Sequence, residues 1–187
     1  MEFTLALLLY AVLQLIAFLF VLVGTPIDMF RLRDEPPFGN TPCITLWGSK
    51  VECYGLTFEL KSDDLWSPCP RRRDNVRAAQ AFAVISIFVY GLAALFGFIM
   101  LCCCPWLRVV CLVLNVTGVI TLCIVWASMV VVYSTLDSPC FGLKSRYNFG
   151  SGFVLLVFAW CLDIINMVFL LLPSQARDRS ENADTKE

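Results

Sequence analysis

The side chains best placed to do chemistry in this sequence are its ten cysteines, and the chemistry they favour is covalent cross-linking. Cys43 and Cys53 enclose the segment CITLWGSKVEC, and Cys69 and Cys140 lie in other polar stretches. An even set of this kind is typical of disulfides formed in an oxidising compartment. A bridge between Cys43 and Cys53 closes a short loop and stabilises the fold by about 2 to 3 kcal/mol. We predict this bridge, which leaves Cys69 and Cys140 to pair with each other.

The segment between Cys43 and Cys53 has the pattern of a β-hairpin. A two-residue turn at Gly48 and Ser49 would place Cys43 one residue out of register with Cys53. We therefore predict an odd-numbered loop centred on Gly48, which would adopt a positive φ; a bulge is the alternative. Trp47 then lies near the hairpin tip, where it either packs against the loop or reaches the lipid headgroups. Packing is favoured, because small stapled modules use aromatic side chains as core.

The other six cysteines follow a different pattern. A cluster next to one apolar stretch, Cys102, Cys103 and Cys104, has two interpretations: S-acylation, which would pin the turn to the bilayer, or three reduced thiols at a helix end. The cluster lacks the paired spacing of a zinc site. The last three, Cys111, Cys123 and Cys161, fall inside apolar stretches, where free cysteine usually packs as a small apolar residue.

Four apolar stretches must position these loops. The chain is 59% hydrophobic and 16% charged, against about 25% charged residues in soluble domains. The stretches cover residues 3–24, 78–101, 109–133 and 151–172 and contain neither Lys nor Arg. Each meets the length of about 20 residues that crosses hydrocarbon. We predict a membrane all-α fold over residues 1–187: a four-transmembrane-helix bundle with a disulfide-stapled, β-rich first extracellular loop. A signal peptide is the minor alternative for the first stretch, since Glu2 replaces the usual basic residues.

The charges and the cysteines disagree about orientation. Most Lys and Arg residues lie in the long loops 25–77 and 134–150, which the positive-inside rule would place in the cytoplasm. Disulfides in these loops require an oxidising compartment instead. We follow the cysteines and predict extracellular loops, a cytosolic turn at 102–108 and a cytosolic tail at 173–187.

Asp163 is the only acidic residue within the predicted spans. Because the helices alternate in direction, Gln14, Asn115 and Asn166 fall near the same depth, so the four side chains are predicted to form one polar layer. A charge there costs about 3 kcal/mol or more. The favoured interpretation is a neutral Asp163 hydrogen-bonded to Asn115, a contact worth about 0.6 kcal/mol. The alternative is a proton-binding group in an ion or solute path.

Several classes of function lack their residues in this chain. It contains no His, no G-x-S-x-G motif and no P-loop, which argues against His-based catalysis, His metal sites and nucleotide binding. We expect no enzymatic activity, no cofactor, no metal site and no nucleic-acid partner.

The segment CITLWGSKVEC matches, position by position, the signature of the amastins, surface proteins of trypanosomatid parasites. The segments GTPIDMFR at 24–31 and FAWCLDIIN at 158–166 also resemble amastin sequences. A more distant similarity is to claudins, in architecture alone. The resemblance implies a four-helix plasma-membrane protein with cytosolic termini and a surface-exposed first loop. The signature residues are Cys43, Thr45, Leu46, Trp47, Gly48, Lys50, Glu52 and Cys53.

These features predict a multi-pass cell-surface protein with a structural or interaction role. The first loop, with Trp47, Phe58 and Trp66, would mediate contact between parasite and host membranes or serve membrane homeostasis. The alternative is proton, ion or small-solute transport through the bundle, using Asp163. The expected partners are the lipid bilayer, host membranes or surface proteins, and further copies of the chain. Ala93 and Gly97 form a small-residue step that would face either the bundle or such a copy.

Overall fold

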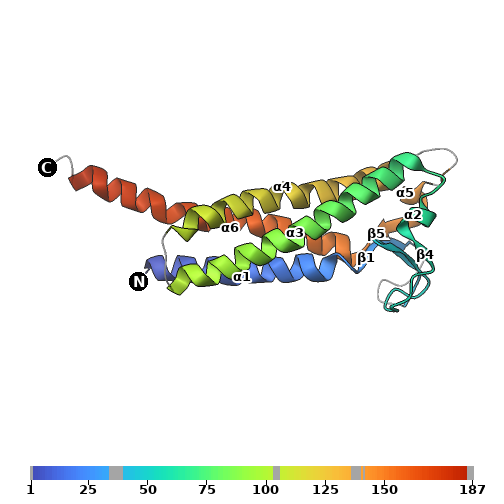
Figure 1. Ribbon diagram of the computed structural model, residues 1–187, viewed down its shortest axis with the longest axis horizontal. Coiled ribbons are helices and arrows are strands. Elements are labelled where there is room, and N and C mark those ends of the chain that lie inside the picture. Colours follow the sequence, from blue (N-terminus) through green and yellow to red (C-terminus); the bar gives the residue numbers. More distant parts are fainter. Residues whose placement is uncertain (1, 34–39, 103–105, 136–139, 141, 185–187) are drawn as a thin grey trace.

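Four long helices form an elongated bundle with a small sheet at one end (Figure 1). The computed structural model describes residues 2–33, 40–102, 106–135, 140 and 142–184. Each long helix contains a segment long and apolar enough to cross a membrane, with a hydropathy of 2.5 to 2.8. The predicted four-helix fold is confirmed. The helices are α1 (Glu2–Gly24), α3 (Pro70–Cys102), α4 (Leu107–Ser134) and α6 (Ser151–Asp184).

Two helices extend beyond the predicted apolar spans. Helix α3 begins at Pro70 rather than near residue 78, and α6 continues to Asp184, within the predicted tail. Proline suits the first position of a helix, where its missing N–H costs nothing. The arginines that follow it are good helix formers. Hydropathy marks only the part of a helix that lies in lipid, so it placed this end of α3 in the loop.

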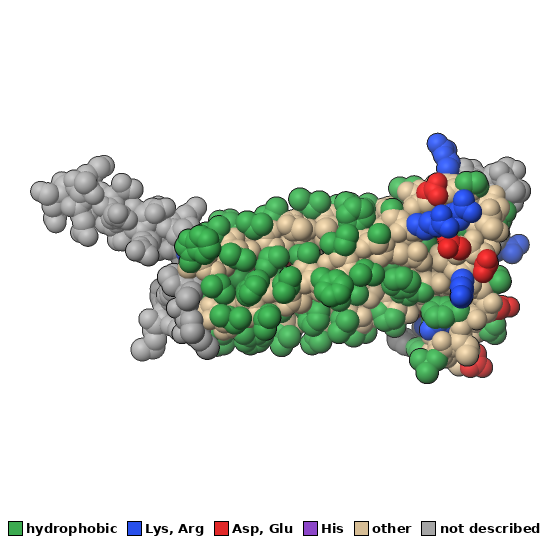
Figure 2. Space-filling view, in the orientation of Figure 1, with side chains coloured by type: hydrophobic (Ala, Val, Ile, Leu, Met, Phe, Trp, Pro, Cys, Tyr) green, Lys and Arg blue, Asp and Glu red, His purple; other side chains and the backbone are tan. Residues whose placement is uncertain are grey.

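The surface of the bundle separates by polarity along its length. Apolar side chains cover the bundle in Figure 2, whereas the charged side chains gather at the end that carries the sheet. In water such a surface would be unfavourable, but lipid tails are as apolar as these side chains. The boundary between the two surfaces marks where the bundle leaves the hydrocarbon.

Inside the bundle, small residues on one helix receive aromatic side chains from the next. A Cβ added at Gly97 would lie 3.0 Å from Cε1 of Tyr10, and one at Gly91 would lie 3.2 Å from Cε2 of Phe18. Ala93 is also buried. The small-residue step of Ala93 and Gly97 therefore faces α1 within the bundle rather than a second copy of the chain.

The sheet combines both long loops. Its order is β4-β3-β2-β1-β5, and every pairing is antiparallel. This confirms the predicted β-rich first loop, but β5 comes from the second loop, which the sequence did not suggest. We call the strands, with α2 (Ser62–Leu65) and α5 (Leu143–Arg146), the head. The strands are β1 (Asp28–Leu32), β2 (Cys43–Thr45), β3 (Gly48–Lys50), β4 (Leu60–Lys61) and β5 (Tyr147–Phe149).

The head and the bundle share one hydrophobic core. Met29, Phe30 and Leu46 of the head belong to the same buried cluster as residues of all four long helices. Aromatic rings continue the contact, with centroids of Tyr133 and Phe149 4.3 Å apart and those of Phe149 and Phe153 4.2 Å apart. The head is therefore fixed on the bundle and is not a separate module on a linker.

Candidate functional site

The hairpin of the head has a tighter turn than predicted. Cys43 pairs with Lys50 and Ile44 with Ser49, which leaves Leu46 and Trp47 as a two-residue turn. The predicted odd loop centred on Gly48 is therefore wrong. Its premise was a direct cross-strand cystine, but β3 ends at Lys50 and the chain turns back before Cys53 reaches its partner.

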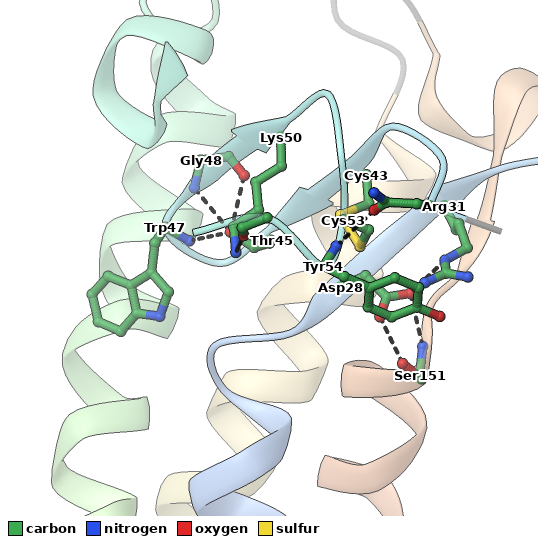
Figure 3. The surroundings of a disulfide bond; sticks show 12 residues. Asp28, Arg31, Cys43, Thr45, Trp47, Gly48, Lys50, Cys53, Tyr54 and Ser151 are labelled. Carbon is green, nitrogen blue, oxygen red and sulfur yellow. Dashed lines mark hydrogen bonds and ion pairs between the residues drawn. A yellow bond between two sulfur atoms is a disulfide. The ribbon is translucent and has the colours of Figure 1, made fainter. Parts of the chain in front are cut away.

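The Thr45 side chain closes this turn. Its hydroxyl oxygen accepts hydrogen bonds from the backbone N–H groups of Trp47 at 3.1 Å and Gly48 at 3.2 Å. The same hydroxyl donates to the carbonyl of Gly48 at 2.9 Å. This buried hydroxyl therefore provides hydrogen-bond partners for the polar backbone groups of the turn, which do not need water. This arrangement, visible in Figure 3, gives Thr45 its role in the signature segment.

Gly48 is required by its backbone and by its neighbour. Its φ is 156°, which confirms the predicted positive φ, although in β3 rather than in a loop. A Cβ at this position would collide with the carbonyl oxygen of Leu60 and lie 3.2 Å from Cα of Lys61. Any larger residue would push β4 away from β3.

The predicted bridge between Cys43 and Cys53 is present, with their Cα atoms 5.4 Å apart. The turn that follows β3 is ordered by Lys50. Its Nζ donates to the carbonyl of Gly55 at 2.9 Å and lies 4.9 Å from the centroid of the Phe58 ring. Gly55 also donates its backbone N–H to the carbonyl of Glu52 at 2.9 Å. These contacts and the disulfide hold the turn between β3 and β4 in one conformation.

Asp28 joins the sheet to the start of α6. It accepts hydrogen bonds from the Ser151 hydroxyl at 2.6 Å and the Ser151 backbone N–H at 3.1 Å, as Figure 3 shows. It also accepts one from Nε of Arg31 at 3.1 Å. Burial opposes the charge on Arg31, but contacts with Tyr54 and Asp28 outweigh it and raise the pKa of the guanidinium. A carboxylate at a helix N-terminus is also favoured by the helix dipole.

Further contacts anchor the hairpin tip to the helices. Nε2 of Gln80, on α3, donates to the carbonyl of Leu46 at 2.8 Å. Trp47 is half-buried and packs against the shared core, which agrees with the packing interpretation. A second disulfide, between Cys69 and Cys140, ties the start of α3 to the second loop. Trp66 is buried beneath the Arg72 guanidinium, so it is not available to a partner.

One part of the head is apolar and faces outward. Leu56 is 94% exposed, and Val51, Tyr54 and Phe58 are exposed beside it in the turn between β3 and β4. We call these four residues the apolar tip. Large exposed apolar groups on an ordered loop usually mark an interaction surface. Unlike the signature residues, which are mostly buried, the tip presents apolar side chains at the surface.

Of the four residues in the predicted polar layer, the structure pairs Gln14 with Asn166, whereas Asn115 pairs with Tyr10, which the sequence did not suggest. Nδ2 of Asn166 donates to Oε1 of Gln14 at 2.7 Å, and Nδ2 of Asn115 donates to the Tyr10 hydroxyl at 3.1 Å. All four side chains are at most 1% exposed. The layer therefore belongs to the closed core of the bundle.

Asp163 is fully buried next to this layer, but not as expected. Its carboxylate packs on Gly118, where an added Cβ would lie 2.9 Å from Oδ2. Its polar neighbours are Tyr90 and Gln14, and neither carboxylate oxygen is in hydrogen-bonding geometry with a described group. The predicted hydrogen bond to Asn115 is wrong, because Asn115 faces α1 one turn away from Gly118.

A comparison with known protein families matches residues 15–170 to the family described as amastin surface glycoprotein. The chain belongs to the amastin surface glycoprotein family. The match spans all five strands, both disulfides and Asp163. The amastin surface glycoproteins are not an enzyme family. No curated protein and no solved structure matches the chain.

The remaining cysteines singled out in the sequence lie within or next to the long helices of this amastin. Cys102, Cys103 and Cys104, the predicted acylation cluster, lie outside the residues whose side chains the structure describes. Cys111 is buried and Cys161 is exposed on the apolar surface.

Sequence reasoning missed Asp28, Ser151 and Gln80 as organisers of the amastin head. A usable signal existed for Ser151 alone, since it begins an apolar stretch and helix starts favour Ser. Asp28 is 123 residues away in sequence, so this signal could not identify it. No signal in the sequence indicates that Gln80 reaches a carbonyl of the hairpin.

Proposed function

We propose that this amastin is a plasma-membrane protein with cytosolic termini whose head docks onto a facing host membrane. The observation that carries the proposal is the apolar tip. Its four residues extend from a turn that is fixed by the Cys43–Cys53 disulfide and by Lys50. A surface that is already ordered loses little entropy on binding, which favours an adhesive role.

Lipid is the partner that best fits the chemistry of the tip. Leu56 and Val51 are aliphatic, whereas Tyr54 and Phe58 are aromatic residues that favour the interface between headgroups and hydrocarbon. Lys61, which is exposed in β4 at the end of this turn, would meet lipid phosphates. Shallow insertion of such an amphipathic tip would hold two membranes together without a protein receptor.

The orientation follows from the same elements. The two disulfides both lie in the head, which supports an oxidising, extracellular environment for it. Since the chain crosses the membrane with four helices, both termini would then lie in the cytosol. The arginines at the base of the head offset this argument under the positive-inside rule.

A test in cells uses deletion of the gene followed by growth of the parasite inside host cells. Rescue is compared between the wild-type gene, Leu56→Ser with Tyr54→Ser, and the control Thr57→Ser in the same exposed turn. We expect the wild type and the control to restore growth and the double variant to fail while reaching the surface in equal amount. Full rescue by the double variant would contradict the docking role.

The alternative function is transport of protons, ions or small solutes, and Asp163 is the observation that favours it. An intramembrane acid marks such paths in many transporters. The burial of Gln14, Asn115 and Asn166 to at most 1% exposure argues for packing instead. Proton flux into liposomes separates the two: negligible and equal flux with wild type and Asp163→Asn excludes transport, and flux that the substitution abolishes supports it.

A further inference from the structure

A basic pocket lies at the seam between α3 and α4, where the bundle meets the head. It has a volume of about 290 Å³ and is lined by Arg71, Arg72, Asn75, Val131 and Thr135. The lining residues belong to the first turns of α3, the last turn of α4 and the residue that caps α4, Thr135. This is the end of the bundle where the apolar surface gives way to charged side chains (Figure 2), which is where lipid headgroups would lie.

The two arginines of the pocket differ in burial and in their contacts. Arg72 is buried, donates to the carbonyl of Thr135 and lies 5.7 Å from the centroid of the Trp66 ring. It thus supplies a fixed positive charge to the wall. Arg71 is exposed, and its side chain forms no ion pair within the described part of the chain. Asn75 donates to the backbone carbonyl of Arg71 at 3.0 Å and so steadies the turn that carries it.

A pocket lined by two arginines attracts an anion with several acceptor oxygens. Phosphate fits them, because arginine donates to it in a planar, bidentate fashion. Val131, which is exposed on the apolar surface, forms the remaining wall. A ligand with a phosphate on one side and hydrocarbon on the other would match both walls, and a membrane phospholipid is such a ligand.

We propose that this pocket binds the phosphate of an anionic phospholipid in the head-side leaflet of the protein's own membrane. The Arg71 guanidinium donates hydrogen bonds to the phosphate, and an acyl chain of the lipid lies along Val131. Occupancy also accounts for two of three successive arginines, Arg71 and Arg72, on the side of the membrane where the positive-inside rule does not expect them. The site is independent of the apolar tip, which faces the opposite membrane.

The test measures phospholipid retained by the full-length protein in detergent, using native mass spectrometry with added phosphatidylinositol. The variants are Arg71→Gln and the control Arg77→Gln, which removes the same charge from the same helix outside the pocket. Arg71 is exposed, and the ion pair between Arg77 and Asp63 is solvent-exposed and contributes little to stability, so neither change should disturb folding. We expect wild type and Arg77→Gln to retain one lipid equally, and Arg71→Gln to bind it about tenfold more weakly, the factor expected for one charge-assisted hydrogen bond.

Two competitors identify the source of the phosphate. Diacylglycerol with the same acyl chains lacks the phosphate and should not displace the lipid. A large excess of inorganic phosphate should also fail, because it lacks the apolar part. Equal lipid retention by Arg71→Gln and wild type, or complete displacement by inorganic phosphate, would overturn the proposal.

Discussion

Asp28 accepts two hydrogen bonds from Ser151, at 2.6 Å and 3.1 Å, although 123 residues separate them in sequence. One residue begins the first strand of the head and the other begins the last helix of the bundle. The contact fixes the direction in which the sheet leaves the membrane. It makes the head a rigid extension of the bundle, which the docking proposal requires.

Loss of the Asp28 carboxylate should loosen the head from the bundle. Asp28→Ala removes the acceptor of both Ser151 hydrogen bonds and the ion pair with Arg31, and we expect a destabilisation of about 1 to 3 kcal/mol. The measurement is thermal unfolding of the purified protein in detergent. Asp74→Ala is the matched control, because Asp74 is exposed at the surface. Equal unfolding of the two variants would show that the Asp28 contact does not hold the head.

The Thr45 hydroxyl should contribute measurably to the stability of the protein. Thr45→Val keeps the shape of the side chain but removes three hydrogen bonds of the hairpin turn, and we expect a loss of about 1 to 3 kcal/mol. Thr57→Val, at an exposed position, serves as the control. Thermal unfolding of both variants provides the comparison, and a Thr45 variant as stable as the control would be contrary to this account of the turn.

Gln14 and Asn166 should act as a pair. Each single change to Leu leaves the other amide unpaired in the bundle, so each should destabilise the protein, whereas the double variant should cost less than the sum. The coupling energy expected from membrane proteins is about 0.6 kcal/mol and at most about 1.7 kcal/mol. A double-mutant cycle on unfolding free energies measures it. Strict additivity would mean that the hydrogen bond contributes nothing.

Orientation can be tested on the unmodified protein. A membrane-impermeant amine reagent applied to intact cells should label Lys61, which is exposed in the head, but not Lys186 in the predicted cytosolic tail. Permeabilised cells should label both and provide the control. Labelling of Lys186 alone in intact cells would place the head in the cytosol.

The sequence predicted features that depend on composition and on nearby residues. The four spans follow from long apolar stretches, and the bridge between Cys43 and Cys53 follows from an even set of cysteines in polar loops. Both features can be predicted because a long apolar stretch must cross the membrane and an even set of cysteines in polar loops tends to pair. The start of α3 escaped this reasoning, since its first turns are polar.

Contacts between distant segments could not be predicted in the same way. Strand β5 has only the three residues Tyr147–Phe149, too few for an alternating pattern to stand out. The two-residue turn was missed because the Thr45 hydroxyl, rather than the cystine, sets the register. Asn115 was assigned to Asp163 on depth alone, but the direction in which a side chain leaves its helix decides its partner, and Asn115 faces Tyr10.

The most direct test of docking uses proteoliposomes that display the head and dye-labelled protein-free vesicles with phosphatidylcholine and an anionic lipid. Vesicle capture is measured by flotation for the wild type, Leu56→Ser with Tyr54→Ser, and the control Thr57→Ser. Burial of a leucine contributes about 1.5 to 3 kcal/mol, so we predict equal capture by wild type and control and a loss of about tenfold or more in the double variant. Equal capture by all three proteins, or no capture by the wild type, would contradict the claim that the apolar tip docks onto lipid.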